Sequence, residues 1–124
     1  MKISQINQNS YLFGTRKQFK RMFDKCAYSN EEFYPWDTST IEHIIPESCG
    51  GEDDYANYLV VKRSWNMHRS STPLDEFITM YPEVKENIKN TVKSKEGQII
   101  EGINWAEEVK KTLFKAIGYD IFEE

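Results

Sequence analysis

The stretch IEHIIPESCGGEDDYANYLVVKRSWN, residues 41–66, decides the fold of this chain. Residues 40–46 are rich in β-branched side chains and end at a proline, which predicts a β-strand. Residues 58–61 predict a second strand, and the glycine-bearing residues 47–56 predict the loop between the two. Residues 63–70 then predict a short helix. The order strand, loop, strand, helix is therefore the expected centre of the fold.

Polar residues stand at the landmarks of this unit. His43 lies within the first strand behind Glu42, Asn57 lies just before the second strand, and Asn66 lies on the helix. Side chains alternate along a strand, so we expect Glu42 and His43 to point to opposite faces unless the strand bends. An imidazole can take a proton from water, and carboxylate and amide oxygens suit Mg²⁺ or Mn²⁺. Such a set could hydrolyse a phosphodiester with one divalent ion.

The segments that flank this unit predict helices. Residues 15–25 predict a short amphipathic helix, because Phe19, Met22 and Phe23 recur at a helical spacing. Three more helices are expected in the second half of the chain, over residues 73–81, 83–95 and 105–117. Residues 1–14 are polar and weakly patterned, so we expect a tail or an edge segment there.

Length and composition predict one domain of the α+β class. A chain of 124 residues with 39% hydrophobic residues can build one modest core. We expect an N-terminal segment with a basic helix over residues 1–37, the strand-loop-strand-helix unit over 38–72 and a helical extension over 73–124.

The sequence predicts a cytoplasmic protein with no membrane partner. It has no apolar run of about 18 residues that could cross a bilayer. The N-terminal residues lack the apolar block of a secretory signal. Cys26 and Cys49 are not part of a C-x-x-C pair, and we expect free thiols rather than a disulfide.

The net charge of −4 speaks mildly against nucleic acid as a partner, but the charges are unevenly distributed. Basic residues gather in two segments, at Arg16, Lys17, Lys20, Arg21 and Lys25, and again at Lys62, Arg63 and Arg69. The two segments could form one positive face, or they could be ordinary solvated helix surfaces.

Together these residues resemble the HNH endonuclease family, whose core is the ββα-metal fold. IEHIIPESCGG is similar to the family's acid-His-Ile-x-Pro followed by a Gly-Gly loop. NYLVVKRSWN is similar to its asparagine, apolar strand and second asparagine, and RKQFKRMFDKCAYS to its basic lead-in helix. The resemblance covers about residues 16–77, roughly half of the chain. It implies a small ββα-metal core with an N-terminal helix and a C-terminal helical extension.

The resemblance also implies a role for each polar residue. His43 would be the general base that activates water, and Glu42 and Asn66 would be the two protein ligands of one Mg²⁺ or Mn²⁺ ion. Asn57 would steady the loop and the histidine more than take part in the chemistry. Glu42 stands where the family usually has the shorter aspartate, which changes the reach of that ligand.

The family's zinc knuckle, in contrast, is missing. The matching positions are Cys26, Ser29, Lys62 and Trp65, and one thiol in four cannot form a tetrahedral zinc site. We therefore expect no structural zinc. Instead we expect apolar packing in that space by aromatic side chains, namely Tyr28, Phe33, Tyr34, Trp36 and Trp65.

The function that the resemblance implies is a metal-dependent endonuclease that cleaves DNA. The resemblance also implies a place in a restriction or phage-defence system, in which a partner protein directs the nuclease to its DNA. The expected nucleic-acid contacts are Arg16, Lys17, Lys20, Lys62, Arg63 and Arg69. His68 points away from Asn66 on the same helix and is a lesser candidate for a phosphate or metal contact. Two alternatives stay open at this point: an inactive module that binds nucleic acid or protein, and a nuclease that cleaves RNA.

Overall fold

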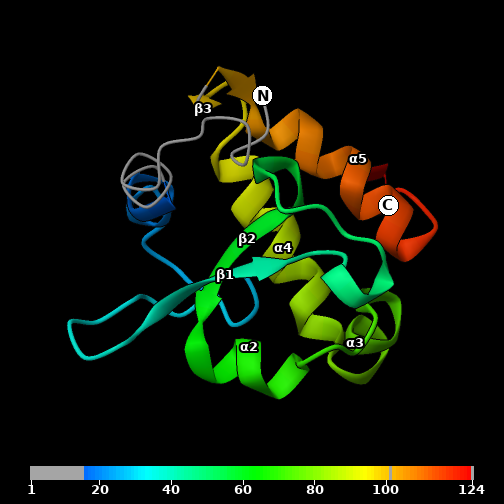
Figure 1. Ribbon diagram of the computed structural model, residues 1–124, viewed down its shortest axis with the longest axis horizontal. Helices are drawn as coiled ribbons and strands as arrows, with labels where there is room; N and C mark the ends of the chain where they lie inside the picture. Colours follow the sequence, from blue (N-terminus) through cyan, green and yellow to red (C-terminus); the bar gives the residue numbers. More distant parts are fainter. Residues whose placement is uncertain (1–15, 101, 124) are drawn as a thin grey trace.

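The fold is α+β, with two small antiparallel sheets and several helices (Figure 1). The computed structural model describes residues 16–100 and 102–123. The segment predicted as a polar tail, residues 1–14, lies outside the described residues. No helix in the described ranges has the length and apolar character needed to cross a membrane.

The predicted strand-loop-strand-helix order is present. Strand β1 (Ser39–His43) pairs antiparallel with β2 (Tyr58–Lys62), so that His43 lies opposite Tyr58. Helix α2 (Arg63–Arg69) follows β2 without a linker. Strand β1 ends three residues earlier than predicted, because the chain turns after His43 into the short 3-10 helix η2 (Glu47–Cys49).

The register gives the hairpin two faces with different neighbours. The α2 face carries Thr40, Glu42, Leu59 and Val61, and the histidine face carries Ser39, Ile41, His43, Tyr58, Val60 and Lys62. Asn66 and Arg69 of α2 contact Thr40 and Glu42 respectively, which places α2 on the first of these faces. The alternation of Glu42 and His43 that the sequence predicts is confirmed.

The N-terminal helical residues 16–21 pack on the histidine face. The Arg16 guanidinium donates a hydrogen bond to the Tyr58 hydroxyl at 3.1 Å, and the Phe19 ring centroid lies 5.9 Å from that of Tyr58. The helix ends at residue 21, before the predicted end at residue 25. The hairpin is thus held between this helix and α2 (Figure 1).

The helices of the second half agree closely with the sequence-based prediction. They are α3 (Leu74–Met80), α4 (Pro82–Ser94) and α5 (Trp105–Ile117). The Asn104 side chain caps the start of α5 by accepting from the Glu107 amide, and Gly118 ends it with a φ of 96°. The prediction missed the small sheet of β3 (Ile99–Ile100) and β4 (Ile103–Asn104) and the 3-10 helices η3 (Tyr55–Asn57) and η4 (Ile121–Glu123).

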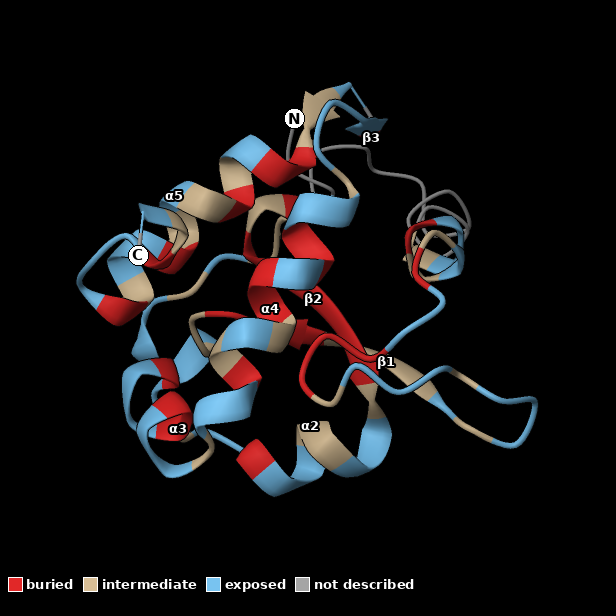
Figure 2. Cartoon of the chain, turned by 180° about the vertical axis from the view of Figure 1, so that it is seen from behind, coloured by how far each residue is buried: buried red, intermediate tan, exposed pale blue. Residues whose placement is uncertain are grey.

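One core joins the hairpin to the helices. Trp105 at the start of α5 is fully buried, and the rings of Phe19 and Phe23 pack edge-on against it at 6.0 and 5.1 Å. Figure 2 shows the buried residues running through β2, α4 and the inner side of α5. Because this core fills the interior, the part-exposed side chains of His43 and Asp53 lie at its margin.

Candidate active site

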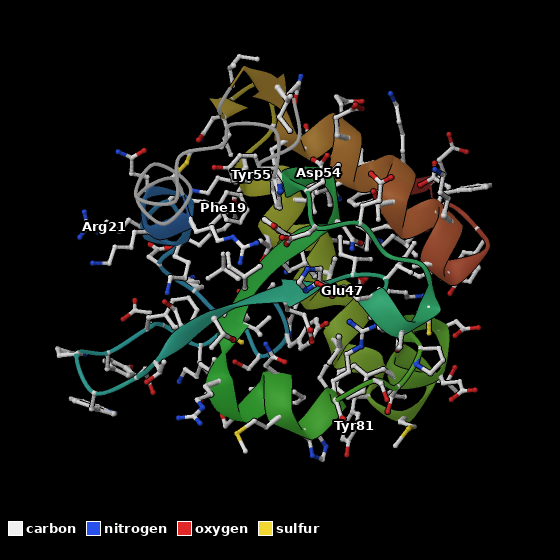
Figure 3. The ribbon with its side chains drawn as sticks, viewed as in Figure 1. Phe19, Arg21, Glu47, Asp54, Tyr55 and Tyr81 are labelled. Carbon is white, nitrogen blue, oxygen red and sulfur yellow. The ribbon has the colours of Figure 1, made fainter. Side chains whose placement is uncertain are left out.

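His43 lies at the end of β1 and faces two carboxylates. Its side chain is 24% exposed, and its Nε2 atom lies 3.2 Å from Asp53 Oδ1 and 3.4 Å from Glu47 Oε1. The imidazole stands edge-on to the ring of Tyr58, with 5.4 Å between the centroids. Figure 3 shows Glu47 where the chain leaves β1. The three side chains therefore form one cluster that solvent can reach.

Asp53 is the fixed member of this cluster. Arg16 donates to its Oδ2 at 2.5 Å, and the Tyr58 hydroxyl donates to its Oδ1. Burial raises the pKa of the Asp53 carboxyl, but the Tyr58 hydrogen bond and the Arg16 charge outweigh burial and hold that pKa below its ordinary value. Asp53 thus presents a charged, oriented carboxylate to the imidazole.

Asn57 and Gly51 shape the loop that carries the two carboxylates. The Asn57 amide accepts from the Ile45 amide at 2.9 Å and donates to the carbonyls of Ile45 and Glu52 at 3.0 and 2.8 Å. A Cβ atom on Gly51 would lie 1.7 Å from the Ile45 carbonyl oxygen, so only glycine fits there. Asn57 therefore has the loop-holding geometry that the sequence predicts.

Glu42 has a different environment from His43, although the two are adjacent. Its carboxylate points to the α2 face, accepts a hydrogen bond from the Tyr28 hydroxyl at 3.0 Å and lies 3.6 Å from the Arg69 guanidinium. The residue is only 5% exposed. Burial raises the pKa of Glu42 to about 7, although Arg69 and Tyr28 both act to lower it. Its carboxylate is engaged within the protein.

Arg69 is fully buried, which is inconsistent with the predicted contact to nucleic acid. Its guanidinium donates to the carbonyls of His43 and Ile44 at 2.8 Å each and to that of Thr72 at 2.9 Å. A further bond goes to the Tyr28 hydroxyl at 3.0 Å. The helix spacing that suggested a phosphate contact instead points Arg69 into the protein, where it joins α2 to the end of β1.

Asn66 also lies on the α2 face. Its amide nitrogen donates to the Thr40 hydroxyl at 3.1 Å and to the Ile41 carbonyl at 3.2 Å. The predicted ligand pair of Glu42 and Asn66 is thus separated from His43 by the hairpin itself. The reason is the alternation along β1, with no bend to bring Glu42 round to the imidazole.

The remaining predicted nucleic-acid contacts lie at or near the protein surface. They are Arg16, Lys17, Lys20, Lys62 and Arg63. The Lys20 Nζ atom lies 3.5 Å from the Ser39 carbonyl oxygen at the start of β1. Lys62, which shares the histidine face, pairs with Asp37 at 3.4 Å. Except for Arg63 at the start of α2, these cations lie along the side of the hairpin where His43 is found.

His68, the other histidine, contacts a different set of residues from His43. Its Nε2 atom lies 2.6 Å from the Tyr81 hydroxyl, and its ring packs edge-on against Trp65 at 5.9 Å. These partners belong to α2 and the turn between α3 and α4. His68 is therefore a natural comparison residue for His43.

The positions of the missing zinc knuckle are partly filled as predicted. Cys26 is buried and free, and its sulfur accepts from the Lys62 amide at 3.3 Å. Tyr28 and Trp65 pack edge-on, with 6.3 Å between ring centroids. Tyr34 and Trp36, however, do not enter this packing and are exposed. The prediction of aromatic burial is wrong for these two.

The sequence-based prediction missed Glu47 and Asp53. Glu47 follows His43 by four residues and Asp53 by ten, within a loop that also carries Glu52 and Asp54. The signal available was an acid-rich loop after a histidine. Nothing in its composition distinguishes the two acids that face the imidazole from the two that do not.

Comparison with known proteins identifies no relative. No protein-family model, no curated protein and no solved structure matches the chain. The motif residues alone carry the resemblance to the HNH family, and the His43 cluster is the feature from which a function can be inferred.

Proposed function

We propose that this protein is a metal-dependent endonuclease of the HNH type, which hydrolyses phosphodiester bonds in DNA. One observation carries the proposal: a half-buried imidazole at the end of β1 faces two carboxylates from the loop that Asn57 holds in place. The strand-loop-strand-helix order around it is consistent with a ββα-metal arrangement.

His43 is the general base in this proposal, and Nε2 is its reacting nitrogen. Nε2 lies 3.2 Å from Asp53 Oδ1 and 3.4 Å from Glu47 Oε1, so it faces the place where these carboxylates would hold an ion. With the ring proton on Nδ1, the lone pair on Nε2 can take a proton from water. Arg16 and Tyr58 hold Asp53 in place beside this nitrogen.

Glu47 and Asp53 are the residues that would hold the divalent ion. Their carboxylate oxygens and the His43 ring nitrogen lie within 4.8 Å of one another, a spacing that suits a single ion. Carboxylate oxygens are the preferred ligands of Mg²⁺ and Mn²⁺. The bound ion would neutralise charge on the phosphate and assist the leaving oxygen.

The test is cleavage of supercoiled plasmid DNA with Mg²⁺, with Mn²⁺ and with a chelator. We expect cleavage only with metal. His43→Ala should lower the rate by roughly 100-fold or more, the usual range for losing a general base. It should leave Mn²⁺ binding, measured by calorimetry, in place. An RNA substrate assayed in parallel decides between the two kinds of nucleic acid.

The matched control is His68→Ala, which removes the other histidine from a site on the opposite side of the hairpin. We expect its cleavage rate to equal that of the unaltered protein. Equal rates for the unaltered protein and His43→Ala would contradict the proposal. A fall in the His68→Ala rate as large as that of His43→Ala would show that histidine loss acts through the fold.

A further inference from the structure

An aromatic pair stands exposed at the tip of a projecting loop. Residues 31–38 extend away from the body of the protein, as both views of the chain show (Figures 1 and 2). Tyr34 is 46% and Trp36 78% exposed. Their rings are stacked with 5.0 Å between centroids and 14° between planes. Contiguous exposed aromatic surface is typical of interaction sites.

The pair is held in place before any ligand arrives. The Asp37 amide donates to the Tyr34 carbonyl at 2.9 Å, and the Tyr34 amide donates to the Asp37 carboxylate at 2.8 Å. The Lys62 ammonium lies 5.7 Å from the centroid of the Tyr34 ring. Because the turn is already closed, a flat ligand would lose little affinity to ordering of the loop.

A basic pocket adjoins the base of the same loop. Its volume is about 330 Å³, and it is lined by Lys17, Lys20, Arg21, Phe23, Phe33 and Ser39. Three of these side chains are cationic and none is acidic. Such a lining is complementary to phosphate groups.

The pocket, the aromatic pair and His43 share one side of the hairpin. Ser39 and His43 are the first and last residues of β1 and belong to the histidine face, roughly 13 Å apart by the rise of a strand. Lys62, beneath the Tyr34 ring, is the register partner of Ser39. A strand seated in the pocket could therefore extend towards the imidazole.

From this arrangement we propose that the protein binds an unpaired nucleic-acid strand, with a base stacked on the Tyr34–Trp36 pair and phosphates in the basic pocket. In a duplex the faces of the bases are covered by one another, so an aromatic platform favours unpaired bases. This inference rests on the proposed function only for the direction of the strand towards His43. It names the substrate class as single-stranded or locally unpaired nucleic acid.

Binding is measured by fluorescence anisotropy with a chelator present, so that no cleavage occurs. The probes are a labelled single-stranded DNA, the blunt duplex of the same sequence and the matching single-stranded RNA. We expect the single strands to bind at least about tenfold more tightly than the duplex. Trp36→Ala should weaken single-strand binding by roughly tenfold, the effect of losing one stacked base.

The control for the aromatic pair is Tyr119→Ala. Tyr119 is 45% exposed and has the Lys85 ammonium 5.8 Å from its ring centroid, but it lies beyond the end of α5. Its loss should leave binding unchanged. Equal affinity for duplex and single strand overturns the inference, and so does a Trp36→Ala variant that binds as well as Tyr119→Ala.

The pocket is tested with the double variant Lys20→Ala, Arg21→Ala. It should weaken binding to every probe and lower the slope of log affinity against log salt by about one to two. The exposed pair Lys93→Ala, Lys111→Ala removes the same charge from other helices and should not change the slope. An equal change of the slope in both double variants would contradict the assignment of the pocket as the phosphate site. Because these assays contain a chelator, they measure strand binding alone. Their results are therefore independent of whether the protein is a hydrolase.

Discussion

The two faces of the β1–β2 hairpin use the same chemical groups for different purposes. On the α2 face, the Glu42 carboxylate and the Arg69 guanidinium are buried together and satisfied by protein partners. On the histidine face, Glu47 and Asp53 surround an imidazole that solvent can reach. Glu42 and His43 are neighbours in sequence, yet one belongs to the core and the other to the candidate site.

The difference teaches that exposure decides what an ionisable cluster can do. A buried ion pair whose members have filled their hydrogen bonds offers nothing to a ligand, and removing one partner is costly. A part-exposed cluster keeps contact with water and can exchange that water for an ion or a substrate. We therefore expect substitutions on the α2 face to change stability and those on the histidine face to change binding and cleavage.

The largest expected effect on stability follows from breaking the buried pair. Arg69→Met keeps the length of the side chain but removes the charge that faces Glu42 and the donor to three carbonyl groups. We expect a loss of roughly 3–5 kcal/mol in the free energy of unfolding, measured by urea denaturation. Arg63→Met, which changes an exposed residue of the same helix, is the control and should cost about 0.5 kcal/mol or less. Equal losses would contradict the assignment of Arg69.

The dependence of stability on pH is the next test of the contrast between the two faces. The pKa of Glu42 is raised to about 7 in the folded protein, above the ordinary value of 4.5. The folded state therefore binds more protons than the unfolded state between these values. The stability that this group contributes is fully present below pH 4.5 and is lost as the pH rises through about 7. The loss is roughly 3 kcal/mol, because one pKa unit corresponds to about 1.4 kcal/mol.

Glu42→Gln should remove this pH dependence while it keeps the shape of the side chain. The measurement is the free energy of unfolding of both proteins from pH 4 to 8 with a chelator present. The difference between the two curves isolates Glu42 from all other carboxyl groups. A difference that stays constant across the series would show that Glu42 has an ordinary pKa.

Measurements of Mn²⁺ affinity distinguish the two possible ligand sets, which are Glu47 with Asp53 and Glu42 with Asn66. Glu47→Gln and Asp53→Asn should each weaken Mn²⁺ binding by roughly tenfold, as expected for loss of one charged ligand from a small site. Asn66→Ala, on the α2 face, should leave the affinity unchanged and serves as the control. Calorimetric titration measures all three. If Asn66→Ala alone weakens binding, the ligand pair predicted from the sequence is the correct one.

The smallest expected effect concerns the support of Asp53. Tyr58→Phe removes one hydroxyl that donates to Asp53 and accepts from Arg16, with the ring retained. We expect a loss of about 1 kcal/mol in stability, the usual contribution of one hydrogen bond. Cleavage should fall by less than about tenfold, because His43 and Asp53 remain. A fall as large as that of His43→Ala would make the tyrosine hydroxyl part of the chemistry.

The sequence by itself determined the helices and strands of this protein and the position of His43 on the first strand. The helix from Trp105 to Ile117 has the predicted bounds, because an asparagine cap, a regular apolar stripe and a glycine all act within one segment. The two strands also follow in the predicted order, because their β-branched residues and the glycine-bearing loop between them are local signals too. The alternation of side chains along β1 also places Glu42 and His43 on opposite faces of the hairpin.

Only the tertiary structure decided which charged groups meet. The pairing of Arg69 with Glu42, and of Arg16 with Asp53, joins residues far apart in the sequence. Four acids share the loop after His43, and only the folded path of that loop decides that Glu47 and Asp53 reach the imidazole. Local patterns carry no record of such contacts, because burial and distance arise only when separate segments pack against one another.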